Sequence, residues 1–567
     1  MTAFLLDAFE RAAGRGGSLT LTSAGGDETI SWAQVHAEAI GLAGFLQTAG
    51  IGRGTAVGLL GTTSRTLVTA IRAVWLAGAS VTVVTPPTNG DPTLVADACH
   101  SAVRSADLDV LLLCPPFDPF ATGLTASPAV RGCRVVAVDD RMRQAVAGTP
   151  YTRPELTDDD TALRQFTSGS TGEPKAVRIT HGNLAANLSG IMDVTRHEEV
   201  PDCLVSWLPL FHDMGLIGFL ALPMSCGACR LVLSTPEEFL ARPTSWLANV
   251  SRYRGTAIGA PAFAYGLAAR LLQPGADLDL SHVRFALCGA EPIDPDIIGS
   301  FTARAAQHGF NPAAMVCAFG MAEATLAVSL VPPGRGMHID EVDTAILQTE
   351  KRAVPASPGA ATTRHPRLGQ PLPGIDVRVV DPDTGVVRDD RDIGEIQLRG
   401  TSVSPGYVHT TGPDGLLTDG WLSTGDLGYL TDGEIIVCGR RKEILIVGGR
   451  NITPHDVERA AAQAEGVRAG RVAAFRGPDR PGADTLVVAV EARTPDTDAL
   501  RDAVITAVVT QVGLRPHAVI ILDPGALPKT TSGKIRRTEL RQRYLAGEFA
   551  GDMAPYEAAG IPAGARP

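Results

Sequence analysis

The sequence is poor in lysine, has no excess of positive charge and contains no long apolar run. Only five of its 50 basic residues are lysine, and the formal net charge is −11. This charge excludes a general attraction to nucleic acid or to an acidic membrane surface, so anionic ligands must be bound by local groups. The longest apolar runs, such as GLIGFLALPM at 215–224, fall well short of the roughly 20 residues that a membrane helix needs. We therefore expect no nucleic-acid partner and no integral membrane segment.

Cysteine is also scarce, with nine scattered residues in a chain of 567. An odd and scattered set argues against a disulfide framework and favours a reducing compartment. Cys226 and Cys229 form one CxxC pair, but no second pair follows at the spacing of a zinc site, so this pair alone predicts neither metal nor redox chemistry. The first 13 residues carry an acid inside a short apolar stretch and indicate an amphipathic helix rather than a signal peptide. The expected location is cytoplasmic.

The order of the predicted elements favours an α/β protein with at least two domains, because 567 residues exceed what one core usually holds. Helical runs at 30–50 and 65–79 alternate with strand-like runs at 55–61 and 81–87. Such alternation favours parallel sheets with helices on both faces. The pattern changes to short strands rich in glycine and aspartate from 394 to 449.

The predicted domain boundary lies near residue 440. The N-terminal domain then covers 1–440, a C-terminal lid domain covers 441–546, and a tail rich in Gly, Ala and Pro covers 547–567. Such a tail is expected to be flexible, because it offers little apolar surface to bury.

The strongest local signal is FTSGSTGEPKAVRITHGN at 166–183. Glycines and hydroxyls let backbone amides approach an anion, and a lysine adds positive charge. The residues concerned are Thr167, Ser168, Gly169, Ser170, Thr171, Gly172 and Lys175. The order does not fit the P-loop, in which lysine directly follows glycine. The run predicts a phosphate-binding loop of another kind, and an ordinary Ser/Gly surface loop is the alternative.

Five further motifs follow in order, namely CGAEP (288–292), FGMAEAT (319–325), STGDLG (423–428), GRRKEILIVGGRNITPHDVE (439–458) and LPKTTSGKIRR (527–537). With the phosphate loop, they make the chain similar to the adenylate-forming enzymes, which include acyl-CoA synthetases, peptide-synthetase adenylation domains, luciferases and fatty acyl-AMP ligases. The resemblance covers the chain from about residue 25 to about residue 545. It implies an α/β fold in which doubly wound sheets and a small distorted β-barrel form the large N-terminal domain. The smaller C-terminal domain is then mobile and of α+β type.

Carried across by position, the resemblance implies that ATP and Mg²⁺ are used. Glu323 is expected to be the carboxylate linked to magnesium, and Lys534 the lysine that reaches the substrate carboxylate and the α-phosphate. Asp426, with Arg440 nearby, is expected to bind the ribose, and Lys442 to lie at the hinge between the domains. The expected adenine side comprises Gly289, Ala290, Glu291, Phe319, Gly320, Met321 and Ala322.

The placement of the scarce lysines supports this interpretation. Lys175, Lys442, Lys529 and Lys534 all fall inside motifs, and only Lys351 is left over, as an expected surface charge. The chemistry agrees, since an ionised carboxylate needs no strong base to attack phosphorus but does need alignment and charge neutralisation. The chain departs from the common family pattern at Ala176, Phe319 and Ala322, none of which removes a charged group.

Two features favour fatty acyl-AMP ligases within the family. The run SWLPLFHDMGLIGFL at 206–220 resembles the stretch that lines their acyl and nucleotide pocket, and it puts His212 where an amino-acid-activating relative would have an acid. The chain is also longer at 334–367, by roughly one helical hairpin, than most acyl-CoA synthetases. This surplus resembles the segment that packs between the domains of fatty acyl-AMP ligases and hinders the rotation needed for CoA chemistry. An ordinary surface insertion is the alternative.

The predicted function is ATP-dependent activation of a fatty or related aliphatic acid to acyl-AMP, with release of pyrophosphate. The acyl group is then expected to pass to the phosphopantetheine thiol of an acyl carrier protein, or of a carrier domain of a polyketide or peptide synthase. An acyl-CoA synthetase is the alternative within the family. A catalytically silent adenylate-binding protein is the alternative from another class.

Overall fold

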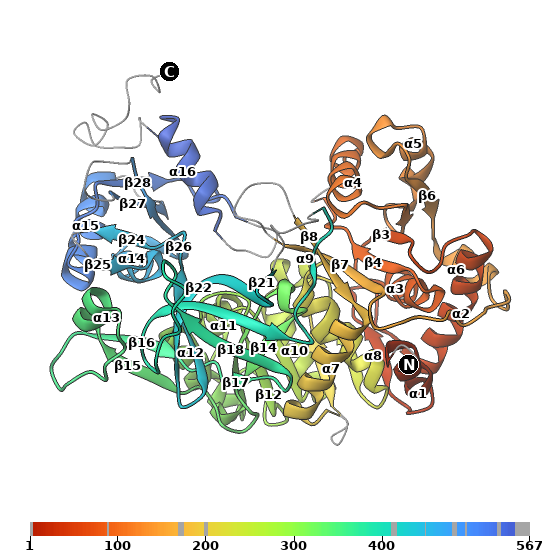
Figure 1. Ribbon diagram of the computed structural model, residues 1–567, viewed down its shortest axis with the longest axis horizontal. Coiled ribbons are helices and arrows are strands. Elements are labelled where there is room, and N and C mark those ends of the chain that lie inside the picture. The colour runs from red at the N-terminus through yellow and green to blue at the C-terminus, as the bar shows by residue number, and fades with distance from the viewer. Residues whose placement is uncertain are drawn as a thin grey trace.

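The computed structural model describes residues 4–87, 90–167, 175–197, 202–409, 417–447, 450–478, 485–493, 496–529 and 535–549. It confirms an α/β fold, in which two large sheets share one continuous hydrophobic core and a smaller unit has cores of its own. Figure 1 shows this smaller unit, in blue, at the opposite end of the molecule from the first helices and strands, in red and orange. Among the described residues, no helix is long and apolar enough to cross a membrane.

The first large sheet has seven strands in the order β20-β8-β7-β4-β3-β5-β6. Their bounds are β20 Gly406–Tyr407, β8 Lys175–Thr180, β7 Thr161–Thr167, β4 Ser80–Val83, β3 Ala56–Leu60, β5 Val110–Leu113 and β6 Arg134–Ala137. The five strands from β7 to β6 run parallel, and β8 and β20 are antiparallel additions at one edge. This sheet therefore receives its last strand from a much later part of the chain.

Helices α2 (Trp32–Thr48), α3 (Arg65–Ala77) and α4 (Pro92–Ala106) connect or flank these strands. Their ends follow from local sequence. Ser31 and Gln34 form a capping box at the start of α2, which satisfies amide groups that the helix itself leaves unpaired. Gly78 ends α3 with φ at 90°, a left-handed conformation that costs glycine little.

The second large sheet has nine strands in the order β17-β14-β13-β12-β11-β9-β10-β1-β2. Their bounds are β17 Gln370–Pro371, β14 Ala327–Leu330, β13 Met315–Gly320, β12 Phe285–Cys288, β11 Ala257–Ala260, β9 Cys203–Ser206, β10 Arg230–Leu233, β1 Ser18–Leu21 and β2 Glu28–Ser31. The central strands are parallel. The surrounding helices are α1 Phe4–Ala13, α7 His181–Thr195, a π-helix at Met214–Ala221, α8 Leu222–Cys226, α9 Pro236–Ala241, α10 Thr244–Tyr253, α11 Ala262–Leu271 and α12 Pro295–Ala305.

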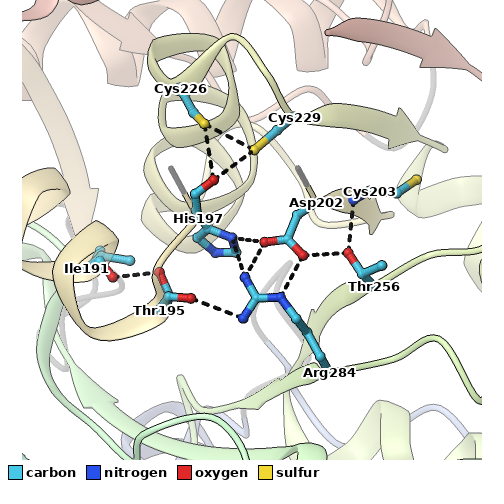
Figure 2. Close-up of polar contacts among 9 residues, drawn as sticks. All are labelled: Ile191, Thr195, His197, Asp202, Cys203, Cys226, Cys229, Thr256 and Arg284. Carbon is cyan, nitrogen blue, oxygen red and sulfur yellow. Dashed lines mark hydrogen bonds and ion pairs between the residues drawn. The ribbon is translucent and has the colours of Figure 1, made fainter. Parts of the chain in front are cut away.

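A buried charged cluster holds the amino ends of three neighbouring strands of this sheet (Figure 2). Asp202, Thr256 and Arg284 immediately precede β9, β11 and β12. Asp202 accepts hydrogen bonds from Thr256 Oγ1 at 2.6 Å and from Arg284 Nε at 2.8 Å, and it also contacts the ring of His197. Burial alone would raise the pKa of Asp202, but the bonds to His197 and Arg284 outweigh burial and lower the pKa to about 2.

Two cysteines lie beside this cluster. The Sγ atoms of Cys226 and Cys229 are 3.3 Å apart and lie 3.4 and 3.9 Å from the carbonyl oxygen of His197. Both side chains are fully buried, and the hydrogen bond with Cys226, together with burial, raises the pKa of the Cys229 thiol. In the part of the chain that the structure describes, no group of three or more His, Cys, Asp or Glu residues could hold a metal ion. These contacts give the CxxC pair a packing role.

A five-stranded antiparallel sheet follows, made of β18 (Ile375–Val380), β19 (Gly394–Gly400), β22 (Trp421–Thr431), β21 (Leu417–Thr418) and β23 (Glu434–Arg440). The chain from 334 to 367 forms a strand, a helix and a strand before this sheet, rather than a helical hairpin. These elements are β15 (Ile339–Asp343), α13 (Thr344–Glu350) and β16 (Thr362–Pro366), and the two strands pair with each other.

The last unit combines a two-stranded and a three-stranded sheet with three helices. Its elements are β24 Leu445–Val447, β25 Arg450–Ile452, α14 Pro454–Ala461, β26 Val467–Arg476, β27 Leu486–Ala492, α15 Thr497–Val512, β28 Ala518–Leu522 and α16 Arg537–Leu545. In Figure 1 this unit lies next to the green segment that contains α13, β15 and β16. Contacts between α13 and β25 confirm that the two segments touch.

Candidate active site

The phosphate loop predicted from the sequence joins two strands at the edge of the seven-stranded sheet. Thr167 ends β7 and Lys175 begins β8, and these two residues are partners in the antiparallel pairing. Thr167 Oγ1 also donates to the carbonyl oxygen of Lys175 at 3.4 Å. Of the other predicted loop residues, Ser168, Gly169, Ser170, Thr171 and Gly172 lie outside the described residues. The structure thus positions both ends of the loop.

Glu323 lies close to Lys175 although it follows a strand of the other large sheet. It sits in a short 3-10 turn, Ala322–Ala324, directly after β13. Its Oε1 accepts a hydrogen bond of 2.8 Å from the hydroxyl of Tyr407. The Nζ atom of Lys175 lies over the ring of the same tyrosine, 5.2 Å from its centroid. Tyr407 therefore contacts both the predicted phosphate-binding lysine, Lys175, and the predicted magnesium carboxylate, Glu323, at the junction of the two sheets.

The backbone next to Glu323 is strained and firmly held. Thr325 has φ at 72° and ψ at −61°, and the amide of Leu326 donates to Ala324 O at 2.9 Å. This is a γ-turn of the rare, strained kind, made by a β-branched residue. The Thr325 hydroxyl donates to Ser402 O at 2.7 Å. Strain that the surrounding structure holds in place is typical of functional sites.

Two neighbouring segments hold the rest of this turn. The amide of Ser404 donates to the Glu323 carbonyl at 2.8 Å. The side chain of Asn187, on α7, donates to the carbonyls of Ala324 and Ala327 at 3.3 and 2.8 Å and accepts from the Ala327 amide at 3.2 Å. The backbone at Glu323 is thus held both by Ser404 and by Asn187 of α7.

Asp426 and Arg440 form an ion pair on neighbouring strands, β22 and β23, where they are partners in register. Arg440 Nε lies 3.0 Å from Asp426 Oδ1, and the aspartate side chain is 6% exposed. Burial, the charge of Glu323 and the hydrogen bond to it raise the pKa of Tyr407, whereas the charge of Arg440 opposes that rise. The charge of Arg440 thus acts in the opposite direction to that of Glu323 on the pKa of Tyr407.

The residues expected on the adenine side lie at the carboxyl ends of two parallel strands. Gly289, Ala290 and Glu291 follow β12, and Phe319 and Gly320 end β13, with Met321 and Ala322 next in the chain. Ligands of open α/β sheets bind at this edge. The charged cluster at Asp202 lies at the opposite ends of these strands, away from this edge.

Close backbone packing marks the same edge. A Cβ added at Gly320 would lie 2.1 Å from Leu326 O, so only glycine fits there. Ala290 has φ at 68°, which is unusual for a residue with a side chain. Glu291 Oε1 accepts a hydrogen bond of 2.7 Å from the amide of Phe263, at the start of α11, where a helix favours negative charge.

His212 lies just before the π-helix. Its Nδ1 is 2.7 Å from Asp213 Oδ1 and 3.3 Å from the amide of Met214. The preceding residue, Phe211, accepts a hydrogen bond of 2.9 Å from Gln165 Nε2, which is on β7 close to the phosphate loop. The segment that contains His212 thus lies against β7, two residues before the strand ends at Thr167. π-helices are rare and occur often at functional sites.

The lysines of the last two motifs differ in how far the structure describes them. Lys442 is exposed in the turn after β23, and Lys534 lies outside the described residues. Lys529 and Ile535 form a bridge that closes the base of the segment containing Lys534. Burial lowers the pKa of Lys529, and the charge of Glu291 is among those that counteract this lowering. The Nζ atom of Lys529 donates to the carbonyl oxygen of Gly470 at 3.0 Å, which holds the base of the last motif against β26.

Several residues of this site are absent from the predicted set, namely Gln165, Asn187, Ser402, Ser404 and Tyr407. Ser402 and Ser404 stand in the run GTSVSPG at 400–406, and Gln165 directly precedes the phosphate-loop motif, so composition offered a signal for these three. Asn187 and Tyr407 carry no such signal. Tyr407 becomes visible only when β20 is seen to pair with β8, a pairing between distant parts of the chain.

Known proteins resemble this chain over most of its length. Residues 9–408 match the family described as AMP-binding enzyme. The chain is 40% identical over 520 residues to the Mycobacterium tuberculosis protein Rv1013, covering 89% of this chain and 93% of that protein. It is 32% identical over 563 residues to the 4-hydroxyphenylalkanoate adenylyltransferase of the same organism, covering 93% of this chain and 88% of that enzyme.

A structure from a study of fatty acyl-adenylate ligases of E. coli and L. pneumophila superposes with a TM-score of 0.85. It is 29% identical to this chain and the match covers 96% of this chain and 98% of that one. The chain therefore belongs to the AMP-binding family of adenylate-forming enzymes.

Proposed function

We propose that this adenylate-forming enzyme activates a fatty or related aliphatic carboxylic acid, and that ATP and the acid give acyl-AMP and pyrophosphate. The observation that carries the proposal is the contact of Lys175 and Glu323 with Tyr407, and the Asp426–Arg440 ion pair on β22 and β23 adds a further anion and cation. These groups come from both large sheets and the five-stranded sheet. Together they offer cationic, anionic and hydroxyl-accepting groups to one nucleotide.

The reaction needs alignment more than proton transfer. The substrate carboxylate is already ionised at neutral pH and can attack the α-phosphorus directly, while the bond to pyrophosphate breaks. The loop from Thr167 to Lys175 would hold the departing phosphates, and Lys534 would neutralise charge at the α-phosphate. Asp426 would accept hydrogen bonds from the ribose hydroxyls. Lys442 would lie at the hinge on which the last unit, 441–546, moves.

Glu323 fits a role in binding Mg²⁺. Magnesium usually takes one or two carboxylates, with waters and substrate phosphates completing its coordination. Glu323 offers this single carboxylate, with one of its oxygens oriented by Tyr407. The bound ion would supply charge neutralisation for the phosphates.

The acid is proposed from the segment after His212. The π-helix Met214–Ala221 is apolar and almost wholly buried, which suits an aliphatic substrate better than a charged one. The names of the similar proteins include both a fatty acyl and a hydroxyphenylalkanoate enzyme. An acid panel therefore has to include both alkyl and arylalkyl acids.

The acceptor is proposed to be the phosphopantetheine thiol of a carrier protein rather than free CoA. Gln348, in the 334–367 segment, is buried, and its Oε1 accepts from Arg450 Nε at 2.8 Å and from a terminal guanidinium nitrogen at 2.6 Å. Arg450 also donates to Val512 O at 2.7 Å. These bonds tie the segment to the last unit, as expected if it hinders the rotation that CoA chemistry requires.

The test is pyrophosphate release and hydroxamate trapping with magnesium, ATP and the acid panel, followed by addition of CoA or a carrier protein bearing phosphopantetheine. We expect acyl-adenylate to form with alkyl acids. We also expect the acyl group to pass to the carrier protein and not to CoA. Arg450→Ala should increase acyl-CoA formation, whereas Glu350→Ala, exposed on the same helix as Gln348, should not. Ready acyl-CoA formation by the unaltered protein would instead assign it to the acyl-CoA synthetases. Absence of pyrophosphate release with every acid would contradict the proposal altogether.

A further inference from the structure

Tyr407 makes contacts that none of the sequence motifs anticipates. Its hydroxyl donates to Glu323 Oε1 at 2.8 Å, and its ring carries the ammonium of Lys175 at 5.2 Å from the centroid. A cation over an aromatic face is held by the negative charge of the ring face. One side chain therefore contacts both the proposed magnesium carboxylate and the proposed phosphate lysine.

The backbone on each side of Tyr407 is fixed to the strand that begins at Lys175. Gly406 and Tyr407 pair with Arg178 and Val177, and the amide of Val408 donates to Ala176 O at 2.9 Å. Ser404 Oγ donates to the carbonyl of Arg178 at 2.7 Å. The ring is thus held in place before any ligand binds, which avoids an ordering cost at the moment of reaction.

The hydroxyl of Tyr407 donates to Oε1 of Glu323, so this bond uses only one of the two carboxylate oxygens. The Lys175 ammonium and the Glu323 carboxylate contact the same side chain and therefore attract one another. A direct ion pair between them would withdraw both groups from a ligand.

We infer that Tyr407 is a positioning residue that keeps the Lys175 ammonium and the Glu323 carboxylate apart and directs them to different parts of one Mg²⁺–ATP complex. This inference rests on the proposed function, because it takes Glu323 as the magnesium carboxylate. The hydroxyl of Tyr407 binds the Glu323 carboxylate, and the face of its ring binds the Lys175 ammonium. The two parts of the role can therefore be separated by substitution.

The test compares Tyr407→Phe with Tyr407→Leu in the full chain, measuring pyrophosphate release against Mg²⁺ and against ATP. Tyr407→Phe keeps the ring and loses the hydroxyl, so the Mg²⁺ concentration for half-maximal rate should rise about tenfold, as for a lost hydrogen bond to a charged group. The rate at saturating Mg²⁺ should recover to within about twofold of the unaltered protein. Tyr407→Leu should in addition raise the KM for ATP about threefold or more.

Tyr253→Phe is the matched control, because Tyr253 also donates its hydroxyl to a carboxylate, that of Asp27, far from this site. It should leave the Mg²⁺ dependence unchanged. An unchanged Mg²⁺ dependence in Tyr407→Phe would overturn the inference, and so would a rate loss that saturating Mg²⁺ does not restore. If Tyr407→Leu fails to fold, Tyr407→Phe still decides the role of the hydroxyl.

Failure of the proposed function gives a different result. In that case the unaltered protein releases no pyrophosphate with any acid, while ATP binding can still be measured by calorimetry across Mg²⁺ concentrations. A weaker Mg²⁺ effect on ATP binding in Tyr407→Phe would then still support the role of Tyr407. An identical effect in both proteins would overturn that role independently.

Discussion

Substituting Asp202 by asparagine tests the energetic role of the buried cluster at the amino ends of β9, β11 and β12. The carboxylate of Asp202 is fully buried and has a pKa of about 2 against an ordinary value of 3.8. A shift of one unit corresponds to about 1.4 kcal/mol, so the charge contributes about 2 kcal/mol to the free energy of unfolding at neutral pH. Asparagine keeps the shape but loses the charge that Arg284 and His197 contact. We therefore expect a loss of about 2 to 3 kcal/mol.

The pH dependence has a definite sign. A folded-state pKa below the unfolded one stabilises the protein above pH 3.8, and this stabilisation is lost as the pH falls towards 2. About half of the contribution should be gone at pH 3. The difference between the unaltered protein and Asp202→Asn should therefore shrink between pH 7 and pH 3.

Chemical unfolding followed by tryptophan fluorescence is a suitable measurement, because Trp207 and Trp246 are buried beside the nine-stranded sheet. Asp376→Asn is a control, since its ion pair with Arg399 is exposed on both sides and such pairs contribute little. A difference for Asp202→Asn below about 0.5 kcal/mol at pH 7 would refute the reasoning, as would a difference that does not change at pH 3. Adding Arg284→Met to Asp202→Asn should restore part of the loss, because it removes the guanidinium left without its anion.

Three further predictions concern other sites. Arg72→Met should lower the melting temperature, because the buried guanidinium bonds the carbonyl of Phe9 and the ring of His36, each at 2.8 Å, and lies over the Phe9 ring; an unchanged melting temperature would contradict this. Gly320→Ala should weaken ATP binding measured by calorimetry, since the added Cβ would lie 2.1 Å from Leu326 O. An unchanged affinity would contradict the claim that the backbone turn at Gly320 requires glycine. Lys534→Ala should abolish pyrophosphate release while ATP still binds, and undiminished release would remove the role given to that lysine.

The sequence predicts best those elements whose signals are local. The helix expected at 65–79 is α3, and the strand expected at 55–61 is β3, because apolar periodicity and a closing glycine lie within each run. Strands β1 and β2 have only four residues each, too few for an alternation of apolar and polar residues to be recognised, although they pair with each other as well as with β10. The π-helix Met214–Ala221 is apolar on nearly all sides, so no periodicity distinguishes it from a strand or an α-helix.

The same distinction applies to the candidate site. Glu323, Asp426 and Arg440 each stand in a short motif that can be read along the chain. Their neighbours Asn187 and Tyr407 act through pairing and packing between distant segments, and no local pattern announces either of them. The roles of the motif residues stay predictions until the proposed assays are done.

The edge strand β20 has a consequence for the order in which this protein can be assembled during synthesis. Ser404, just before β20, binds the carbonyl of Arg178, a residue 226 positions earlier in the chain. Closing so long a loop is entropically costly unless the intervening chain has already folded. We therefore expect the edge of the strand that begins at Lys175 to stay unpaired until the nine-stranded sheet has formed. A truncated protein that ends before residue 406 should bind nucleotide poorly even if most of its core is intact.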